Sequence, residues 1–301
     1  MNYTVSASFS PIDELLLSYL LYKNPKNSKY LEVGKDWRKQ VEARLSTHFK
    51  NEIETLGDEW LFHYLHVLID KQTYEKQTIE DILSEVSQLS AGDILERIVP
   101  VLKQDKALPQ DILGERDRMI SILKEWDKEY FSTLPSSTIP LLQKANEKTK
   151  EQLTKATPTK VIEELTNGMI FESSFIKHIH VMPSLHFRPL TTYTLYHDCI
   201  SLYYPATTFD SKEARIVLIG KALSDPKRLR ILQQLKGEKR SFTELVHLIG
   251  DTKGNIHHHI SILNTAGLIN RHVDEHCQNT LYSPRVPLLK ELDKHVHALF
   301  S

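Results

Sequence analysis

The sequence has little cysteine and no long apolar run. Among its 301 residues there are two cysteines, Cys199 and Cys277, which match no disulfide framework and suit a reducing cytosol better than secretion. No stretch of about 18 apolar residues occurs, so we expect no transmembrane helix. The first residues, MNYTVSASFSPIDE, lack a basic region followed by an apolar core and do not indicate a signal peptide. We predict a cytoplasmic protein without a membrane partner.

The common motifs of nucleotide and hydrolase chemistry are also missing. There is no Walker loop, no glycine-rich dinucleotide turn, no Gly-x-Ser-x-Gly elbow and no His-Glu-x-x-His pair. We therefore predict that the chain is not an enzyme and carries no cofactor. Catalysis by residues 1–211 stays open as an alternative, but no motif supports it.

Charge is balanced overall but distributed unevenly. The formal net charge is −1, with 38 Lys and Arg against 39 Asp and Glu. Residues 212–301 carry a net charge of +5 and eight of the fifteen histidines, whereas residues 1–211 carry a net charge of −6. A basic C-terminal module indicates a part that meets phosphate, although chance alone also produces such differences.

Residues 10–170 have the periodicity of consecutive helices, because apolar residues recur every three or four positions. The segment Asp36–Leu56 predicts one long amphipathic helix. The helical pattern of Ile139–Gly168 is interrupted at Pro158, where we expect a break.

The pattern changes in residues 174–205, which are rich in β-branched and aromatic residues and punctuated by prolines. This composition predicts about three short strands in a small antiparallel sheet packed on helices. We therefore predict a mainly α protein of the α+β type. Residues 1–211 would form a helical N-terminal domain that ends in this sheet, and residues 212–301 would form a second domain.

Residues 212–285 have the pattern of a winged helix-turn-helix. Ser241 and Glu244 have the spacing of a capping box for a helix that ends at Gly250, and Thr252–Gly267 predicts the next helix. The strands of a wing and a last amphipathic helix are expected at Ile269–Val273, Thr280–Ser283 and Pro287–Phe300.

The segment Thr252–Gly267 combines an apolar stripe with a polar face. Placing Ile256 inward puts Ile260 and Leu263 beside it. The N-terminal part of such a helix inserts into the major groove, where Asn pairs with adenine and Lys reaches guanine or phosphate. Polar residues of the wing suit minor-groove or phosphate contact. The predicted DNA contacts are Thr252, Lys253, Gly254, Asn255, His257, His258, Ser261, Arg271, Gln278 and Asn279.

The three consecutive histidines of this segment do not indicate a metal site. Consecutive helical residues point about 100° apart and cannot all face one ion. We expect His259 to turn toward the core. Lys227, Arg228 and Arg230, upstream, fit phosphate contacts and a merely solvated face equally well.

Three stretches carry a resemblance to a known family: ALSDPKRLRILQQL, FTELVHLIGDTKGNIHHHISILNTAGLI and INRHVDEHCQNTLYSP. Over residues 214–284, about a quarter of the chain, they resemble the ArsR-type winged-helix repressors. The resemblance implies a dimeric, DNA-binding transcription regulator whose affinity is controlled by a signal, with an additional large N-terminal domain.

The chain departs from the two familiar metal sites of that family. Ser241 and Thr243 stand where thiol-based sensors carry a Cys-x-Cys pair. Asp293 and His295 match the opening of the other site, whose second half would fall beyond Ser301. The resemblance therefore does not imply metal sensing here, and we predict no metal site.

The N-terminal domain offers two further candidates, both with a simpler interpretation. Four histidines fit a zinc site, but ordinary sheet histidines are favoured; they are His178, His180, His186 and His197. An aromatic cluster with Arg188 fits a pocket for an aromatic or acidic small molecule, but a packed core is favoured; its members are Phe187, Tyr193, Tyr196, Tyr203 and Tyr204. A small-molecule effector of unknown identity is thus left open.

The whole pattern predicts a sequence-specific DNA-binding transcriptional regulator. We expect a repressor that binds a roughly palindromic operator on double-stranded DNA as a homodimer. The alternative is a protein-interaction or scaffold protein that uses its winged helix for dimerisation.

Overall fold

The computed structural model describes residues 3–25, 28, 31–55, 60–70, 73–102, 108–206, 212–274 and 279–285. They divide into two compact units. The N-terminal unit comprises Ser6–Lys150 and His180–Ala206, and the C-terminal unit comprises Met1–Val5, Glu151–Ile179 and Thr207–Ser301. This division differs from the boundary at residues 211 and 212 that the sequence predicts, because residues 151–179 belong to the C-terminal unit.

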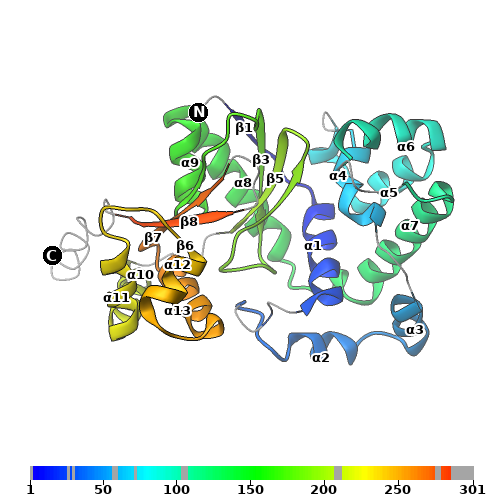
Figure 1. Ribbon diagram of the computed structural model, residues 1–301. Coiled ribbons are helices and arrows are strands. Elements are labelled where there is room, and N and C mark those ends of the chain that lie inside the picture. The colour runs from blue at the N-terminus through cyan, green and yellow to red at the C-terminus, as the bar shows by residue number, and fades with distance from the viewer. Residues whose placement is uncertain are drawn as a thin grey trace. The chain divides into compact units, whose positions relative to one another are not determined.

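Most of the N-terminal unit is helical (Figure 1), as the apolar periodicity predicts. Its α-helices are α1 (Pro11–Lys23), α2 (Trp37–Glu42), α3 (Thr47–Thr55), α4 (Leu65–Leu68), α5 (Ile79–Ser87), α6 (Ala91–Ile98), α7 (Ile112–Glu129) and most of α8 (Thr138–Lys155). Short 3-10 segments lie at Trp60–Tyr64, Tyr74–Lys76, Val99–Val101 and Phe131–Thr133.

The core of this unit forms around α1, which is buried on nearly every side. Tyr19 of α1 makes an edge contact with Trp126 of α7, with ring centroids 5.6 Å apart, and Trp126 Nε1 donates to Ser18 Oγ at 2.9 Å. Burying an aromatic pair of this size contributes several kcal/mol by order of magnitude. The two acidic residues of α1, Asp13 and Glu14, are also fully buried, and their contacts are described below.

The predicted long helix at residues 36–56 is wrong, because the structure has α2 and α3 there, separated at residues 43–46. The break has a tertiary cause. Glu129 of α7 accepts the backbone N–H of Ser46 at 2.7 Å, and Ser46 Oγ in turn accepts the N–H of Phe49 at 3.2 Å. Ser46 therefore starts a new helix.

A four-stranded sheet has the order β1-β3-β5-β4, formed by Thr4–Ala7, His178–Ser184, Cys199–Pro205 and Thr192–Tyr196. Three of these strands lie in the predicted region, and β4 and β5 pair antiparallel from Thr192 opposite Tyr203 to Tyr196 opposite Cys199. Strand β1 carries no signal that sequence analysis recognised. The mainly α, α+β class is confirmed.

The C-terminal unit contains α9 (Pro158–Leu165), α10 (Lys212–Leu223), α11 (Pro226–Gln234), α12 (Phe242–Ile249) and α13 (Lys253–Thr265). The break before α9 is the one predicted at Pro158. A second sheet has the order β2-β7-β8-β6, formed by Met169–Phe171, Ile269–Val273, Thr280–Pro284 and Arg240–Ser241. Figure 1 shows α10 to α13 grouped beside these strands. The last predicted helix, Pro287–Phe300, lies outside the described residues.

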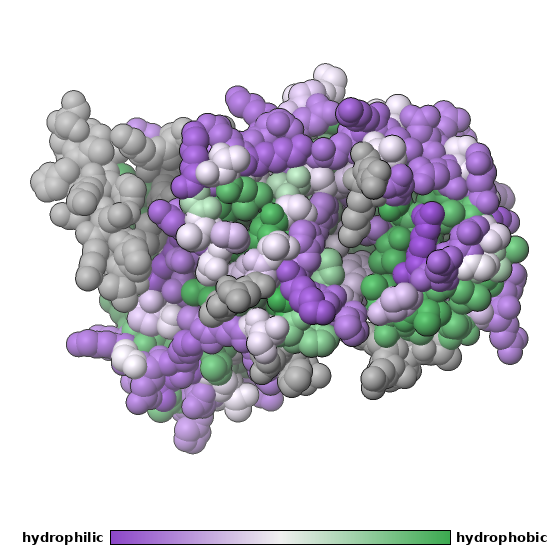
Figure 2. Space-filling model, turned by 90° about the horizontal axis from the view of Figure 1, so that it is seen from above, coloured by the Kyte–Doolittle hydropathy of each residue, from purple (hydrophilic) through white to green (hydrophobic). Residues whose placement is uncertain are grey.

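Large apolar side chains that remain exposed are dispersed among several elements rather than gathered on one. They are Val99, Leu108, Leu113, Leu141, Phe175, Val217, Leu229 and Leu248. The face seen in Figure 2 accordingly mixes hydrophilic and hydrophobic residues. Among the described residues, no helix is long and apolar enough to cross a membrane.

Candidate nucleic-acid interface

Two capped helices and a tight turn build the helix-turn-helix. Ser241 and Glu244 form the predicted capping box at the start of α12, and Gly250 ends that helix in the left-handed conformation with φ +71°. Thr252 then caps α13 by accepting the N–H of Asn255 at 3.2 Å. These local contacts fix where the second helix begins and which of its residues face outward.

Helix α13 has the split face that the sequence predicts. Ile256, Ile260 and Leu263 are buried against α10, α11 and α12. The exposed residues of its first two turns and cap are Thr252, Lys253, Gly254, Asn255, His257 and His258. Ser261, one turn further along, is only partly exposed. The structure therefore brings most of the predicted contacts together on one polar surface, which we call the α13 face.

The three histidines of α13 have different surroundings. His259 is 8% exposed and turns toward the core, as predicted, with its Nδ1 atom 4.0 Å from Asp225 Oδ2. Burial lowers the pKa of His259 below its usual value. The ring of His257 instead makes an edge contact with Phe242 of α12 at 6.4 Å between centroids. Among the described residues, no three His, Cys, Asp or Glu side chains are grouped as a metal would need.

An acidic residue just before the cap, Asp251, organises the start of α13 through its side-chain contacts. Asp251 pairs with Lys227 of α11 and accepts from Asn255 Nδ2 at 2.9 Å and from the N–H of Thr252 at 2.7 Å. Hydrogen bonds from Lys227 and Asn255, with that N–H, hold the pKa of Asp251 well below its usual range. The Asn255 amide is thereby oriented before any ligand arrives. Nothing in the local pattern signals this contact, since Lys227 is 24 residues away.

The three basic residues of α11, which are Lys227, Arg228 and Arg230, also have different surroundings. Arg228 is 8% exposed and donates to the carbonyl oxygens of Ala222 at 2.6 Å and Lys221 at 2.7 Å, so it fastens α10 to α11. Neither of the two alternatives considered for it, phosphate contact or solvated face, describes that role. Arg230 is exposed.

The predicted DNA contacts on the wing are less accessible than those of the α13 face. Arg271 lies in β7, between β2 and β8 in the sheet, and its Nε and Nη2 atoms are enclosed. Asn279 is exposed at the end of the hairpin and donates to Asp274 Oδ2 at 2.8 Å. Gln278 lies outside the described residues. The wing therefore contributes Asn279 to an exposed polar surface, while Arg271 is mainly part of the sheet.

Comparison with known proteins agrees with this geometry. Residues 225–271 match the family model described as bacterial regulatory protein, arsR family. These residues form an ArsR-type helix-turn-helix. The match begins at the cap of α11 and ends in β7, so it covers the α13 face but not β8 or the N-terminal unit. No curated protein sequence matches the chain.

The four histidines considered for a zinc site, for which ordinary sheet histidines were favoured, have separate partners. His178 Nδ1 contacts Thr4 Oγ1 at 2.7 Å, and His180 contacts Ser6 Oγ at 2.9 Å and Ser8 Oγ at 2.6 Å. His186 lies beside Glu14 and Tyr130. His197 is next to Asp198, with Nδ1 3.5 Å from the carboxylate.

Proposed function

We propose that this protein is a sequence-specific transcriptional repressor that binds a roughly palindromic operator as a homodimer. The observation that carries the proposal is the α13 face, a polar surface at the N-terminal end of the second helix of an ArsR-type helix-turn-helix. Lys253 and Asn255 stand at the positions where such a helix enters the major groove. The other proposed contacts on this helix are Thr252, Gly254, His257, His258 and Ser261.

The wing adds phosphate or minor-groove contacts in this proposal. Asn279 is the strongest of its described candidates because it is exposed at the hairpin end. Arg271 reaches DNA only if its partly enclosed guanidinium moves, and Gln278 remains a candidate on sequence grounds alone.

The homodimer in this proposal rests on the resemblance of residues 214–284 to the ArsR-type repressors, which implies a dimeric regulator. A palindromic operator follows from such a dimer, since its two-fold symmetry repeats the reading helix on two half-sites.

A footprint of the protein on its own promoter region tests the proposal. We expect one protected site, and Asn255→Ala should lower the affinity for it by about 1–3 kcal/mol for each base pair that the amide reads. Lys236→Ala is the matched control, because Lys236 is exposed in the same unit but lies outside the α13 face and the wing. Equal binding to any duplex, with no protected site, would contradict sequence-specific reading and favour a scaffold role.

A further inference from the structure

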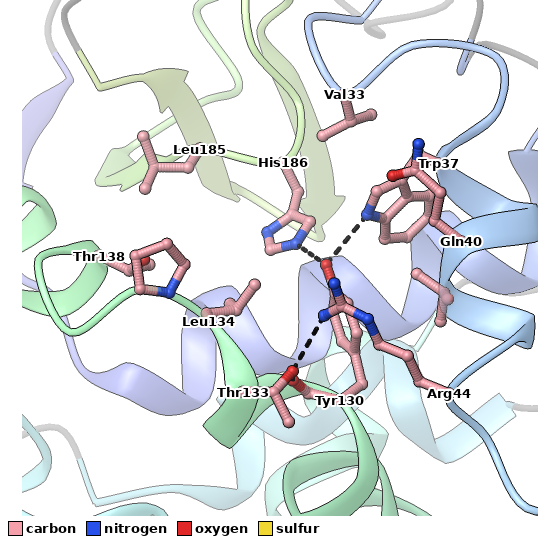
Figure 3. A pocket seen from close by; sticks show the side chains of 12 residues that line it. Val33, Trp37, Gln40, Arg44, Tyr130, Thr133, Leu134, Thr138, Leu185 and His186 are labelled. Atoms are coloured by element: carbon pink, nitrogen blue, oxygen red, sulfur yellow. Dashed lines mark hydrogen bonds between the residues drawn. The ribbon is translucent and has the colours of Figure 1, made fainter.

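A pocket of about 430 Å³ lies wholly within the N-terminal unit (Figure 3). This volume is within the range of small-molecule sites, about 300–1,000 Å³. Trp37 comes from α2, Arg44 from the break after α2, Tyr130 from the end of α7 and His186 from the segment after β3. Segments that are far apart in the sequence therefore line the pocket, and one of them is the break between α2 and α3.

The back wall of the pocket is a chain of hydrogen bonds. Trp37 Nε1 donates to Tyr130 Oη at 3.0 Å, which is 2.8 Å from His186 Nε2, and His186 Nδ1 is 2.5 Å from Glu14 Oε1. Glu14 Oε1 also accepts the backbone N–H groups of His186 at 2.8 Å and Leu185 at 3.0 Å. An oxygen that already accepts two N–H groups acts as acceptor again, so His186 donates through Nδ1.

This assignment fixes the hydrogen-bond partner of each polar group in the wall. With Nδ1 held by Glu14 and the phenol oxygen accepting from Trp37, the remaining contact of the chain joins Tyr130 Oη to His186 Nε2. Burial raises the pKa of Tyr130 to about 12, so the phenol stays neutral. The hydrogen bonds of the wall thus hold the Trp37 and Tyr130 rings in place before a ligand binds.

The open side of the pocket carries a cation. Arg44 is exposed, and its Nη1 atom donates to Thr133 Oγ1 at 3.1 Å, as Figure 3 shows. No Asp or Glu is among the lining residues. Arg38, six residues earlier, is instead paired with Glu42 at 2.9 Å. Apolar side chains make up much of the remaining lining; they are Val33, Val41, Leu134, Pro135 and Leu185.

We propose that this pocket binds a small organic carboxylate with an aromatic or aliphatic body. The guanidinium of Arg44 would receive the carboxylate, since its planar donors match two carboxylate oxygens. The body would lie against the Trp37 ring and the apolar lining. This function goes beyond DNA reading: the site uses none of the residues of the α13 face, and its occupancy is measurable without DNA.

The aromatic cluster considered in the sequence is not this site. Tyr196, Tyr203 and Tyr204 are buried core residues, and Arg188 is paired with Glu32 at 2.6 Å. Sequence analysis left open a site for an aromatic or acidic small molecule. The pocket suits the same kind of ligand but is lined by other residues.

Calorimetric titration of the full chain tests the proposal. The probes are benzoate, 1-naphthoate and octanoate, each paired with its neutral amide. We expect at least one carboxylate to saturate the protein below about 10 mM, and its amide to bind about tenfold or more weakly. Arg44→Gln should weaken the carboxylate by a similar factor, whereas Arg38→Gln, with its ion pair outside the pocket, should leave it unchanged.

Three results would overturn the proposal: saturation by none of the three carboxylates, equal binding of the amides, or equal affinities of Arg44→Gln and Arg38→Gln. Because Arg44 is exposed, its variant should melt at the wild-type temperature, and this check separates a defect in binding from a defect in folding. A footprint with and without the bound carboxylate is a separate measurement. A failure of DNA binding there leaves the carboxylate site standing, and the reverse also holds.

Discussion

Asp13 and Glu14 are adjacent in α1 and equally buried, but their surroundings differ. Glu14 Oε1 receives two backbone N–H groups and the ring of His186. Asp13 Oδ2 accepts from Tyr74 Oη and from the N–H of Ser10, each at 2.8 Å. Burial raises the pKa of Asp13 from 3.8 to about 7, and the nearby carboxylates of Glu14 and Glu75 add to the rise.

The raised pKa of Asp13 predicts that the N-terminal unit loses stability as pH rises. Below about pH 4, Asp13 is protonated in both folded and unfolded chains. Between about pH 4 and about pH 7, Asp13 keeps its proton only in the folded state. The free energy of unfolding should therefore fall through this window by up to about 1.4 kcal/mol per pH unit, and the contribution should level off above it. In Asp13→Asn this fall should disappear, since the amide keeps the acceptor oxygen but does not titrate.

Urea unfolding from pH 5 to pH 8, followed by tryptophan fluorescence, measures this effect. All three tryptophans lie in the N-terminal unit, so the signal reports that unit. Asp36→Asn is the matched control, because Asp36 is exposed and its side chain makes no cap hydrogen bond. Parallel pH profiles for wild type and Asp13→Asn would refute the prediction.

Single residues could be predicted where their role depends on neighbours in sequence. The capping box of Ser241 and Glu244 and the inward turn of His259 follow from spacing along the chain alone. The bond between Glu14 and His186 joins residues 172 positions apart, and the pairing of Lys227 with Asp251 depends on how α11 meets α13. Such contacts are products of packing, so the pattern along the chain carries no trace of them.

Strand β2 is a whole element that the sequence pattern does not predict, because it depends on a distant partner. Residues 169–171 are too few to give an alternating pattern, and their partner in β7 lies about 100 residues later, with Met169 opposite Arg271 in a parallel pair. The N–H of Arg271 donates to Gly168 O at 2.7 Å, and the N–H of Glu172 donates to Val273 O at 3.0 Å. Helices α12 and α13 and the two strands of the hairpin, which depend on local periodicity and turns, were predicted within a few residues.

A side-chain network also fastens the end of β2 to the wing. Glu172 lies 2.8 Å from His272 Nδ1 and pairs with Lys239 through both carboxylate oxygens, one at 2.6 Å. His272 Nε2 in turn contacts Ser283 Oγ at 2.7 Å. Although burial acts to raise it, the pKa of Glu172 is lowered by its bonds to Lys239 and His272. The wing is thus anchored to the segment that precedes it by both backbone and side chains.

Gly168→Ala should detach β2 from the wing. Gly168 has φ +109°, and an added Cβ would lie 2.7 Å from the backbone oxygen of Ile269. We expect a cost of about 2–3 kcal/mol from strain and steric overlap together. Gly237→Ala is the matched control: Gly237 has φ +86° with nothing within 4 Å of an added Cβ, so strain alone should cost about 1 kcal/mol.

Hydrogen exchange of the Arg271 amide is a local readout of this change. Exchange should become about tenfold or more faster in Gly168→Ala than in Gly237→Ala, since each 1.4 kcal/mol of opening free energy is a factor of ten. Equal exchange in the two variants would mean that β2 does not stabilise β7.

Over the whole chain, charge is segregated between a basic C-terminal part and an acidic remainder. Residues 212–301 carry a net charge of +5 within a protein of net charge −1. The chain as a whole therefore gains little from long-range attraction to DNA, and affinity has to come from individual cations placed against phosphates. Lys253 is exposed at the start of α13, whereas Lys227 beside it is already paired with Asp251.

This distribution predicts that two neighbouring substitutions on α13 affect DNA binding differently. If Lys253 contacts a phosphate, Lys253→Ala should weaken binding to operator and unrelated duplex alike and reduce the slope of log K against log salt by about 1. Asn255→Ala should lower operator affinity alone and leave the slope unchanged, because an amide releases no counterion. Fluorescence anisotropy of labelled duplexes at several salt concentrations measures both quantities, with Lys236→Ala as the control for a generic loss of charge. An unchanged slope in Lys253→Ala, together with a weakening confined to the operator, would instead assign Lys253 to a base edge.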